Sequence, residues 1–353
     1  MRVAVVGCGY WGSKHVRVLA DSNDVDQLYL VDSEELRCKG LQRAFPRAEV
    51  QPDLERALAE VDAAVIATPA HTHARLAMRC IEAGVHVLVE KPLATSVADA
   101  VRLVEASRAA GVVLMVGHTF EYNPAVWALR DVIDSGEIGR VYYIDSARLN
   151  LGHYQPDVDV MWDLAPHDIS IVNYLLRAKP AVVRAWGASH AHSHLHDVAY
   201  IRLEFREPEV VTAQVHVSWL DPCKVRRTTV VGSRKMAVYN DLAADERLRI
   251  YDKGLSYDGD GDPNLVRVTQ GAGSDPLHSY PVTYRNGGIT SPFIVFKEPL
   301  KIEDEHFVEC VKSGRTPNTD GLSGLAVVEV LEAASRSIAE ERPVHLSESL
   351  VRV

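Results

Sequence analysis

The sequence predicts a mixed α/β protein with two domains. The first is an N-terminal doubly wound parallel sheet, and the second is a C-terminal open, mainly antiparallel sheet with helices on one face. Short apolar strands alternate with helices from residue 2 to residue 116, which is typical of a parallel sheet. From about residue 182 the strands alternate polar and apolar residues, as in an antiparallel sheet with one wet face. The length of 353 residues suits two domains, which we place at 1–120 and 121–353.

The amino-acid composition and net charge indicate which kind of protein this is and which partners it lacks. Hydrophobic residues make up 47% of the chain, charged residues 24%, and the formal net charge is −10, with no dense basic run. These values indicate a soluble globular protein and argue against a nucleic-acid partner. Five scattered cysteines without metal-ligand spacing favour a reduced, cytoplasmic setting. The first strand begins at residue 2, which leaves no room for a signal peptide, and no apolar run is long enough to cross a bilayer.

The first 32 residues have the order expected of a dinucleotide-binding unit: apolar strand, glycine-rich loop, helix, second strand and acid. In the loop Gly7 permits a tight turn, Gly9 lets the backbone approach a pyrophosphate, and Gly12 allows close helix–strand contact. The start of the helix offers N–H groups and a partial positive charge to the phosphates. Asp32 can accept hydrogen bonds from both hydroxyls of an adenine ribose and would repel a 2′-phosphate, which favours NAD over NADP.

Later strands of the parallel sheet also end in polar residues. The strand over 63–67 leads into a turn at 68–73, before an expected helix over 74–83, and the next two strands end at Glu90-Lys91-Pro92 and at His118. Ligands of such sheets lie at the carboxyl ends of the strands, so these residues should face the cofactor. Besides the three glycines and Asp32, the predicted cofactor contacts are Tyr10, Trp11, Ser33, Thr68, Pro69, His71, His73, Glu90, Lys91 and His118.

Lys91 is the first candidate for chemistry. At a strand end that faces the cofactor crevice, a lysine can polarise a substrate oxygen and act in proton transfer. A surface lysine paired with Glu90 would give the same sequence, and the residues alone leave both interpretations open.

The second candidate is the stretch 161–169, which opens a helix predicted to run to about Leu176, with Pro166 in its first turn. Asp163 and His167 are four residues apart, so both can point toward one cleft, where His167 would be a natural base for a hydroxyl. In the alternative interpretation Asp163 only caps the helix and His167 is a core histidine.

Two further patterns suggest metal ions. Histidines alternate over His190–His196 beside Asp197, but the segment is loop-like, and a metal site is the less favoured interpretation. Aspartates alternate over Asp258–Asp262, but Pro263 takes the position of the calcium-loop glycine and Thr269 that of its final glutamate. We therefore predict no metal ion, and an irregular insertion over residues 254–291.

The glycine loop, Glu90-Lys91-Pro92 and Asp163-x-x-x-His167 occur in the order and spacing of the Gfo/Idh/MocA oxidoreductase family, which the whole chain resembles. The resemblance implies an N-terminal Rossmann domain and a C-terminal sheet used for contacts in a homodimer or homotetramer. It also implies hydride transfer at a sugar or cyclitol carbinol, with Lys91, Asp163 and His167 as the catalytic residues. The chain departs from the family at Ala70, where many members carry Asn near the cofactor.

The stretches 162–168 and 218–226 resemble family members that act on nucleotide-linked sugars, such as UDP-N-acetylglucosaminuronate 3-dehydrogenases of surface-polysaccharide pathways. The cations Lys224, Arg226 and Arg227 either bind a diphosphate or carboxylate or form a solvated strand end. The expected sugar contacts are Tyr122, Asn123, Arg148, Asn150, Trp162, Lys224 and Arg227.

The resemblance thus implies an NAD-dependent dehydrogenase that takes a hydride from a ring carbinol, at C3, of a nucleotide-linked sugar. One alternative is the reverse reaction, a ketoreductase of deoxysugar biosynthesis that uses NADH or NADPH; Asp32 disfavours NADPH. A second is a non-catalytic NAD-binding regulator, which would not need Lys91, Asp163 and His167 together. A third is a redox-assisted glycosidase, which would oxidise C3 transiently and release no net NADH.

Overall fold

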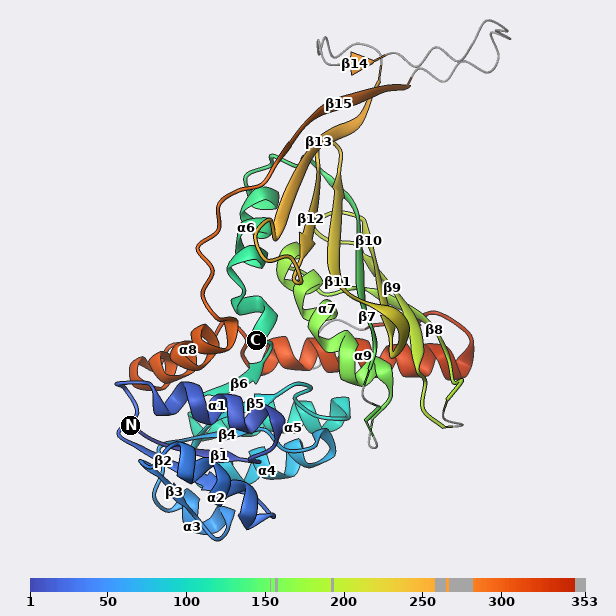
Figure 1. Cartoon of the computed structure of the whole chain (residues 1–353). Coiled ribbons are helices and arrows are strands. Elements are labelled where there is room, and N and C mark those ends of the chain that lie inside the picture. The colour runs from blue at the N-terminus through green and yellow to red at the C-terminus, as the bar shows by residue number, and fades with distance from the viewer. Residues whose placement is uncertain (153, 156–157, 192–193, 258–264, 267–281, 347–353) are drawn as a thin grey trace, which may run out of the picture.

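The computed structural model describes the chain except for residues 153, 156–157, 192–193, 258–264, 267–281 and 347–353. In Figure 1 a smaller sheet with its helices forms the lower part of the molecule, and a larger sheet rises above it. Helix α9 (Gly321–Glu340) runs between the two. No helix in the described part of the chain is long and apolar enough to cross a membrane.

The N-terminal sheet has six parallel strands in the order β3-β2-β1-β4-β5-β6, which confirms the predicted doubly wound sheet. Apolar clusters fill both faces, one beneath α4 and α5 and the other beneath α1, so the short strands are apolar on both sides. The strand order reverses between β1 and β4, where such sheets bind ligands. The elements are β1 (Arg2–Val6), α1 (Tyr10–Ala20), β2 (Gln27–Val31), α2 (Glu35–Ala44), β3 (Ala48–Val50), α3 (Leu54–Leu58), β4 (Ala63–Ile66), α4 (Ala70–Glu82), β5 (His86–Glu90), α5 (Val97–Ala110) and β6 (Leu114–Gly117).

Helix α4 begins at Ala70, so the prediction of a turn over 68–73 and a helix from residue 74 is wrong by one turn. Thr72 accounts for the difference, because its hydroxyl donates to the carbonyl of Pro69 at 2.7 Å and thus closes the first turn of the helix. Threonine usually favours turns through such bonds, which is why the sequence indicated one here. Both histidines of the stretch therefore lie at the start of a helix that faces the crevice.

The second sheet has ten strands in the order β14-β15-β13-β12-β11-β7-β10-β9-β8-β16. Among the described pairings only β7 with β10 is parallel, which confirms a mainly antiparallel sheet. Its strands are β7 (Val141–Leu151), β8 (Val182–Ala188), β9 (Val198–Phe205), β10 (Val211–Ser218), β11 (Leu220–Gly232), β12 (Met236–Asn240), β13 (Leu248–Tyr257), β14 (Leu265–Val266), β15 (Val282–Thr290) and β16 (Val344–His345).

Helices cover one face of this sheet. Helix α7 (Val160–Leu176) contacts β7, β9 and β10, while α6 (Pro124–Asp134) contacts β12 and β13, and α9 contacts β8. Along β9 the side chains of Ile201 and Leu203 are buried on the helix side, whereas Tyr200 faces away and is exposed. The alternation predicted from the sequence is therefore present.

Two parts of the C-terminal half differ from the prediction. Residues 254–291 are not irregular throughout, because β13 reaches Tyr257 and β15 spans Val282–Thr290. The aspartates at 258–262, with Pro263 and Thr269, lie outside the described residues.

A helix that the sequence did not predict, α8 (Pro299–Ser313), follows β15 and packs on α1. The chain then runs alongside β6, where the backbone N–H of Val116 donates to the carbonyl of Thr319 at 2.8 Å. Helices α8 and α9 thus bring the end of the chain back to the N-terminal sheet. This return places α8 beside α1 (Figure 1).

Candidate active site

The glycine loop between β1 and α1 has the geometry of a pyrophosphate cradle. A Cβ atom at Gly7 would lie 2.6 Å from the carbonyl oxygen of Ala67, and one at Gly12 would lie 1.7 Å from that of Gly7. A Cβ at Gly9 would meet nothing within 4 Å, so this residue borders open space. Gly9 is also the N-cap of α1, and no side chain caps it, which leaves the first N–H groups of the helix free for phosphate oxygens. The loop therefore fits NAD.

Asp32 follows β2 at the edge of this loop. Its carboxylate accepts hydrogen bonds from the backbone N–H of Cys8 at 2.6 Å and from that of Glu34 at 2.8 Å. Arg37 approaches it at 3.8 Å but pairs more closely with Glu34, at 2.8 Å. These contacts hold the acid at the crevice, while the neighbouring Ser33 is exposed.

Many of the predicted cofactor contacts line one cavity of about 280 Å³. Thr68, Pro69, His71, Lys91 and Trp11 all line it. His73 also borders the cavity, but its ring nitrogens lie 2.8 Å from the carbonyl oxygens of Thr68 and Pro92, and burial lowers its pKa. Tyr10 is largely exposed at the start of α1.

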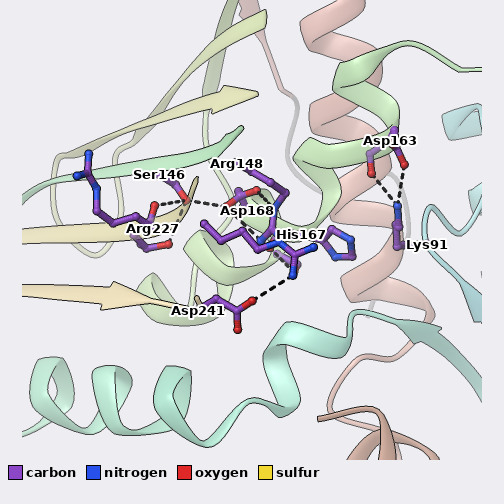
Figure 2. A network of polar contacts seen from close by, with 11 residues as sticks. Lys91, Ser146, Arg148, Asp163, His167, Asp168, Arg227 and Asp241 are labelled. Atoms are coloured by element: carbon purple, nitrogen blue, oxygen red, sulfur yellow. Dashed lines mark hydrogen bonds and ion pairs between the residues drawn. The ribbon is translucent and has the colours of Figure 1, made fainter. Parts of the chain in front are cut away.

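Lys91 reaches across from the N-terminal sheet to helix α7 (Figure 2). Its Nζ donates to the backbone carbonyl of Asp163 at 2.7 Å and lies 3.3 Å from the Oδ1 atom of the same residue. The other carboxylate oxygen of Asp163 accepts from the indole N–H of Trp219 at 3.2 Å. The lysine side chain is only 10% exposed, and it is the backbone N–H of Lys91 that contacts Glu90. The interpretation as a surface lysine paired with Glu90 is therefore wrong.

Helix α7 begins at Val160, three residues before Asp163. Its N-cap is Asp159, whose Oδ1 accepts from the backbone N–H of Trp162 at 3.0 Å, so Asp163 is not the cap. Pro166 consequently lies inside the helix, and the prediction that it stands in the first turn is wrong. Pro166 has no backbone N–H, so the carbonyl of Trp162, four residues earlier, receives no helix hydrogen bond from it. This carbonyl lies on the helical turn that carries Asp163.

His167 is buried on α7, one turn after Asp163. Its ring lies edge-to-face with Phe120, with the ring centres 4.9 Å apart. Burial lowers the pKa of His167 well below its ordinary value, and the charges of Lys91, Arg148 and Arg226 lower it further. A neutral imidazole near neutral pH can accept a proton, which suits a general base.

Behind His167 lies a buried ion pair that the sequence did not reveal. The Nε atom of Arg148 is 2.6 Å from Oδ2 of Asp168, and the hydroxyl of Ser146 donates to the same carboxylate at 2.7 Å (Figure 2). The guanidinium of Arg148 also stacks over Phe120, 4.3 Å from the ring centre. Arg148, a predicted sugar contact, is thus held by Asp168 near His167.

The remaining predicted sugar contacts separate into two groups. Asn123 borders a second cavity, Trp162 lines the first while its indole N–H donates to Ser335 at 3.0 Å, and Asn150 is half-buried on β7. Tyr122 is instead buried in the N-terminal core, with its hydroxyl 3.0 Å from that of Thr319. The structure does not bring Arg148, Asn150, Tyr122, Lys224 or Arg227 to either cavity, and Lys224 and Arg227 are exposed on β11.

Arg226 alone among the three cations of β11 turns toward the site. It pairs with Asp241 at 3.2 Å and lies 5.9 Å from the ring centre of Phe120. Asp241 borders the second cavity, of about 320 Å³, which extends from His167 and Phe120 toward α1 and the start of α8. Sequence reasoning missed the residues on its outer side because it did not predict α8. They are Lys14, Arg17, Phe296, Glu298, Pro299 and Leu300.

The histidine run forms ion pairs. His190 contacts Asp197 at 2.8 Å, and His196 contacts the capping residue Asp159 at 3.1 Å. His192 lies outside the described residues. In the described part of the chain no three His, Cys, Asp or Glu side chains gather as a metal site.

Comparisons with known proteins agree with this geometry. Residues 1–118 match the family model described as an oxidoreductase family with an NAD-binding Rossmann fold, GFO_IDH_MocA, and residues 126–238 match the GFO/IDH/MocA C-terminal domain. The chain is 32% identical over 227 residues to inositol 2-dehydrogenase 2 of Saccharopolyspora erythraea, covering 62% of this chain and 67% of the relative.

Two further similar proteins have a named activity or a bound ligand. The UDP-N-acetylglucosamine 3-dehydrogenase of Acidithiobacillus ferrooxidans is 33% identical over 199 residues, or 54% of this chain and 58% of the relative. The crystal structure of GenD2 from gentamicin A biosynthesis, in complex with NAD, superposes with a TM-score of 0.78 at 27% identity, covering 99% of this chain and 97% of that one.

Proposed function

The chain belongs to the GFO/IDH/MocA oxidoreductase family, and we propose that it is an NAD-dependent dehydrogenase of a nucleotide-linked sugar that oxidises the ring carbinol at C3. One observation carries the proposal: Lys91, which follows β5, donates to the backbone carbonyl of Asp163 on α7 at 2.7 Å, and His167, whose pKa is lowered, follows one turn later. Lys91 lines the first cavity and His167 the second, and Trp11 lines both. A lysine and a neutral histidine on adjoining cavities can act together in proton transfer.

In this proposal His167 takes the proton of the substrate hydroxyl, and Lys91 stabilises the negative charge that develops on the oxygen. Asp163 bonds to Lys91 and Trp219, so its role is to aim the lysine. Bound NAD supplies the hydride acceptor, held by the loop at Gly9 and by Asp32. The buried His118, whose ring nitrogens have no partner among the described residues, lies beside Lys91 as a further cofactor contact.

The larger cavity supports a substrate with a substituent beyond the sugar. It begins at His167, and its outer side carries Lys14 and Arg17 of α1. Arg17 pairs with Glu298, while Lys14 is exposed and lies over the ring of Tyr10. A sugar placed at His167 would direct its anomeric substituent toward these cations, which suits a diphosphate.

The test is NADH absorbance after mixing the protein, NAD⁺ and UDP-N-acetylglucosaminuronate, with UDP-N-acetylglucosamine and myo-inositol as comparison substrates. We expect a sustained rise with a nucleotide sugar, and Lys91→Ala and His167→Ala should lower kcat about 100-fold or more with little change in NAD affinity. The exposed Lys301 on α8 gives a matched control, Lys301→Ala.

Each outcome decides a different part of the proposal. Full turnover in both site variants would remove the roles of Lys91 and His167. A rise only with myo-inositol would overturn the nucleotide-sugar assignment. Consumption of NADPH with a keto-sugar, and no oxidation of any carbinol, would replace the dehydrogenase by the ketoreductase.

We also propose that the protein forms a homo-oligomer through the face of the second sheet that helices do not cover. Trp186 and Tyr200 are 55% and 44% exposed there, and their rings lie 5.9 Å apart, next to His216. Large aromatic side chains on one exposed face favour a protein interface. Light scattering should show a dimer or tetramer that dissociates in Trp186→Glu; a monomeric parent chain would exclude this interface.

A further inference from the structure

A buried chain of charged side chains connects α8 to the strand end that carries Lys91. The Oδ1 atom of Asp304 lies 2.8 Å from Nδ1 of His15, and Nε2 of His15 lies 3.1 Å from Oε1 of Glu90. The second oxygen of Glu90 accepts the backbone N–H of Lys91 at 3.1 Å. The exposed fractions of the Asp304, His15 and Glu90 side chains are 1%, 0% and 6%. Three elements distant in sequence, α8, α1 and β5, meet in this chain.

The contacts favour a protonated histidine, while burial raises the pKa of its partner Asp304. A neutral imidazole has one N–H, whereas His15 faces a carboxylate oxygen with each of its nitrogens. Burial alone would lower the pKa of His15, but Asp304 and Glu90 raise it well above its ordinary value. Burial would in turn raise the pKa of Glu90, but His15 and Lys91 lower it. Buried charges persist when they are paired and hydrogen-bonded, so each group holds the others in place.

The carboxylate of Glu90 has little room on its other side. A Cβ atom at Gly117, on the neighbouring strand β6, would lie 3.2 Å from both Cα and Oε2 of Glu90. Glycine at this position lets the carboxylate lie against β6 while His15 holds it from the side of α1. The side-chain position of Glu90 is thus fixed from two directions.

We propose that His15 and Asp304 are positioning residues for Lys91. Asp304 orients His15, His15 fixes Glu90, and Glu90 holds the backbone of Lys91 where its Nζ meets Asp163. The inference rests on the proposed role of Lys91 in hydride transfer. According to this inference, the orientation of the Lys91 side chain depends on α8. The first residues of this helix, Pro299 and Leu300, border the larger cavity.

The test compares Asp304→Asn and His15→Gln with Glu305→Gln, which changes an exposed neighbour on α8. A 1 Å displacement of a catalytic group can lower rates about 100-fold, so we expect kcat to fall about 10- to 100-fold in the first two variants. The substrate KM and the NAD affinity, read from tryptophan fluorescence, should stay within about threefold, since the ligands' own contacts remain. Asp304→Glu, which keeps the charge, should restore much of the rate.

A second readout needs no substrate. The rate at which acetic anhydride acylates Lys91, measured by mass spectrometry relative to the exposed Lys39 on α2, reports the surroundings of its Nζ. We expect this ratio to change several-fold in Asp304→Asn and to stay constant in Glu305→Gln. Gly117→Ala adds one methyl group against Glu90 and should produce the same signature without removing any charge.

Unchanged kcat and unchanged acylation would overturn the inference. A fall in kcat that is matched by loss of NAD binding or of the folded state would also overturn it, because the residues would then be merely structural. If Asp304→Asn does not fold, His15→Gln and Gly117→Ala decide the same question. If the parent protein oxidises no sugar, the proposed function fails, while the acylation ratio still decides whether Asp304 and His15 position Lys91.

Discussion

The buried pair of Arg148 and Asp168 allows a quantitative prediction. Both side chains are almost inaccessible, with exposed fractions of 6% and 2%, and their closest atoms are 2.6 Å apart. In Arg148→Met the carboxylate of Asp168 would keep only the hydroxyl of Ser146 as a partner. In Asp168→Leu the guanidinium would stay buried against Phe120 without a counter-charge.

Removing one partner of a buried pair costs about 3–5 kcal/mol, because the other charge stays buried and uncompensated. At about 1.4 kcal/mol for each factor of ten, either single variant should lower the folding equilibrium constant about 100- to 3,000-fold. Replacing both partners with apolar side chains of similar volume is often nearly neutral. The free energy of unfolding of the double variant Arg148→Met/Asp168→Leu should therefore lie within about 2 kcal/mol of that of the parent chain.

Urea unfolding of the four proteins measures this double-mutant cycle. Arg227→Met is the matched control, since Arg227 is exposed on the adjacent strand, and it should change the free energy of unfolding by less than about 0.5 kcal/mol. Single variants that cost less than about 1 kcal/mol, or a double variant whose cost is the sum of the two, would refute the argument. If Arg148 also contacts the sugar, the restored double variant will still show a raised KM.

Three further results are expected. Asp32→Ser should lower kcat/KM for NAD and raise it for NADP by about tenfold or more, measured with both cofactors, because the carboxylate no longer repels a 2′-phosphate. Burial lowers the pKa of His118 to about 4 in the folded protein. As the pH falls from 7 to 5, His118 therefore gains a proton in the unfolded chain but stays neutral in the folded one. In urea unfolding, the free energy of unfolding of the parent chain should therefore fall by about 2 kcal/mol more than that of His118→Asn between pH 7 and pH 5. Equal decreases in the two proteins would contradict a buried neutral ring. The acid limb of kcat/KM should lie below the ordinary pKa of histidine and shift to higher pH in Arg226→Met, which removes a charge that lowers the pKa of His167.

The fold followed from the sequence where local pattern and burial agree. Most strands of the parallel sheet are short, apolar and bounded by glycine or polar residues, and they lie where the pattern indicated. The three-residue edge strand β3 was not predicted. Helix α8 escaped prediction because its buried face carries Glu303, Asp304 and His306. Apolar periodicity assigns such residues to the solvent, whereas their burial depends on polar partners elsewhere in the chain. These partners are His15 for Asp304, Thr119 for Glu303 and the backbone N–H of Asn318 for His306.

The site was predictable as far as spacing along the chain determines it. The four-residue interval between Asp163 and His167 put both on one side of α7, and the strand end put Lys91 opposite them. The alternation of β11 shows that Arg226 and Arg227 face opposite sides, but not which side faces the site. That choice depends on Asp241, which binds Arg226 from the neighbouring part of the sheet. The partner of Arg148 was likewise hidden, because the pair joins β7 to α7.

The charges around His167 explain how a histidine with a lowered pKa can still act as the base. Lys91, Arg148 and Arg226 each lower its proton affinity, and each is paired with one carboxylate, Asp163, Asp168 or Asp241. When bound, an oxidised nicotinamide would add one more positive charge near His167, which would favour the neutral imidazole while the substrate binds. The loss of that charge would balance the proton that His167 gained, so the net charge of the site would stay the same. The three ion pairs therefore leave His167 as the group in this cluster that would take up the proton.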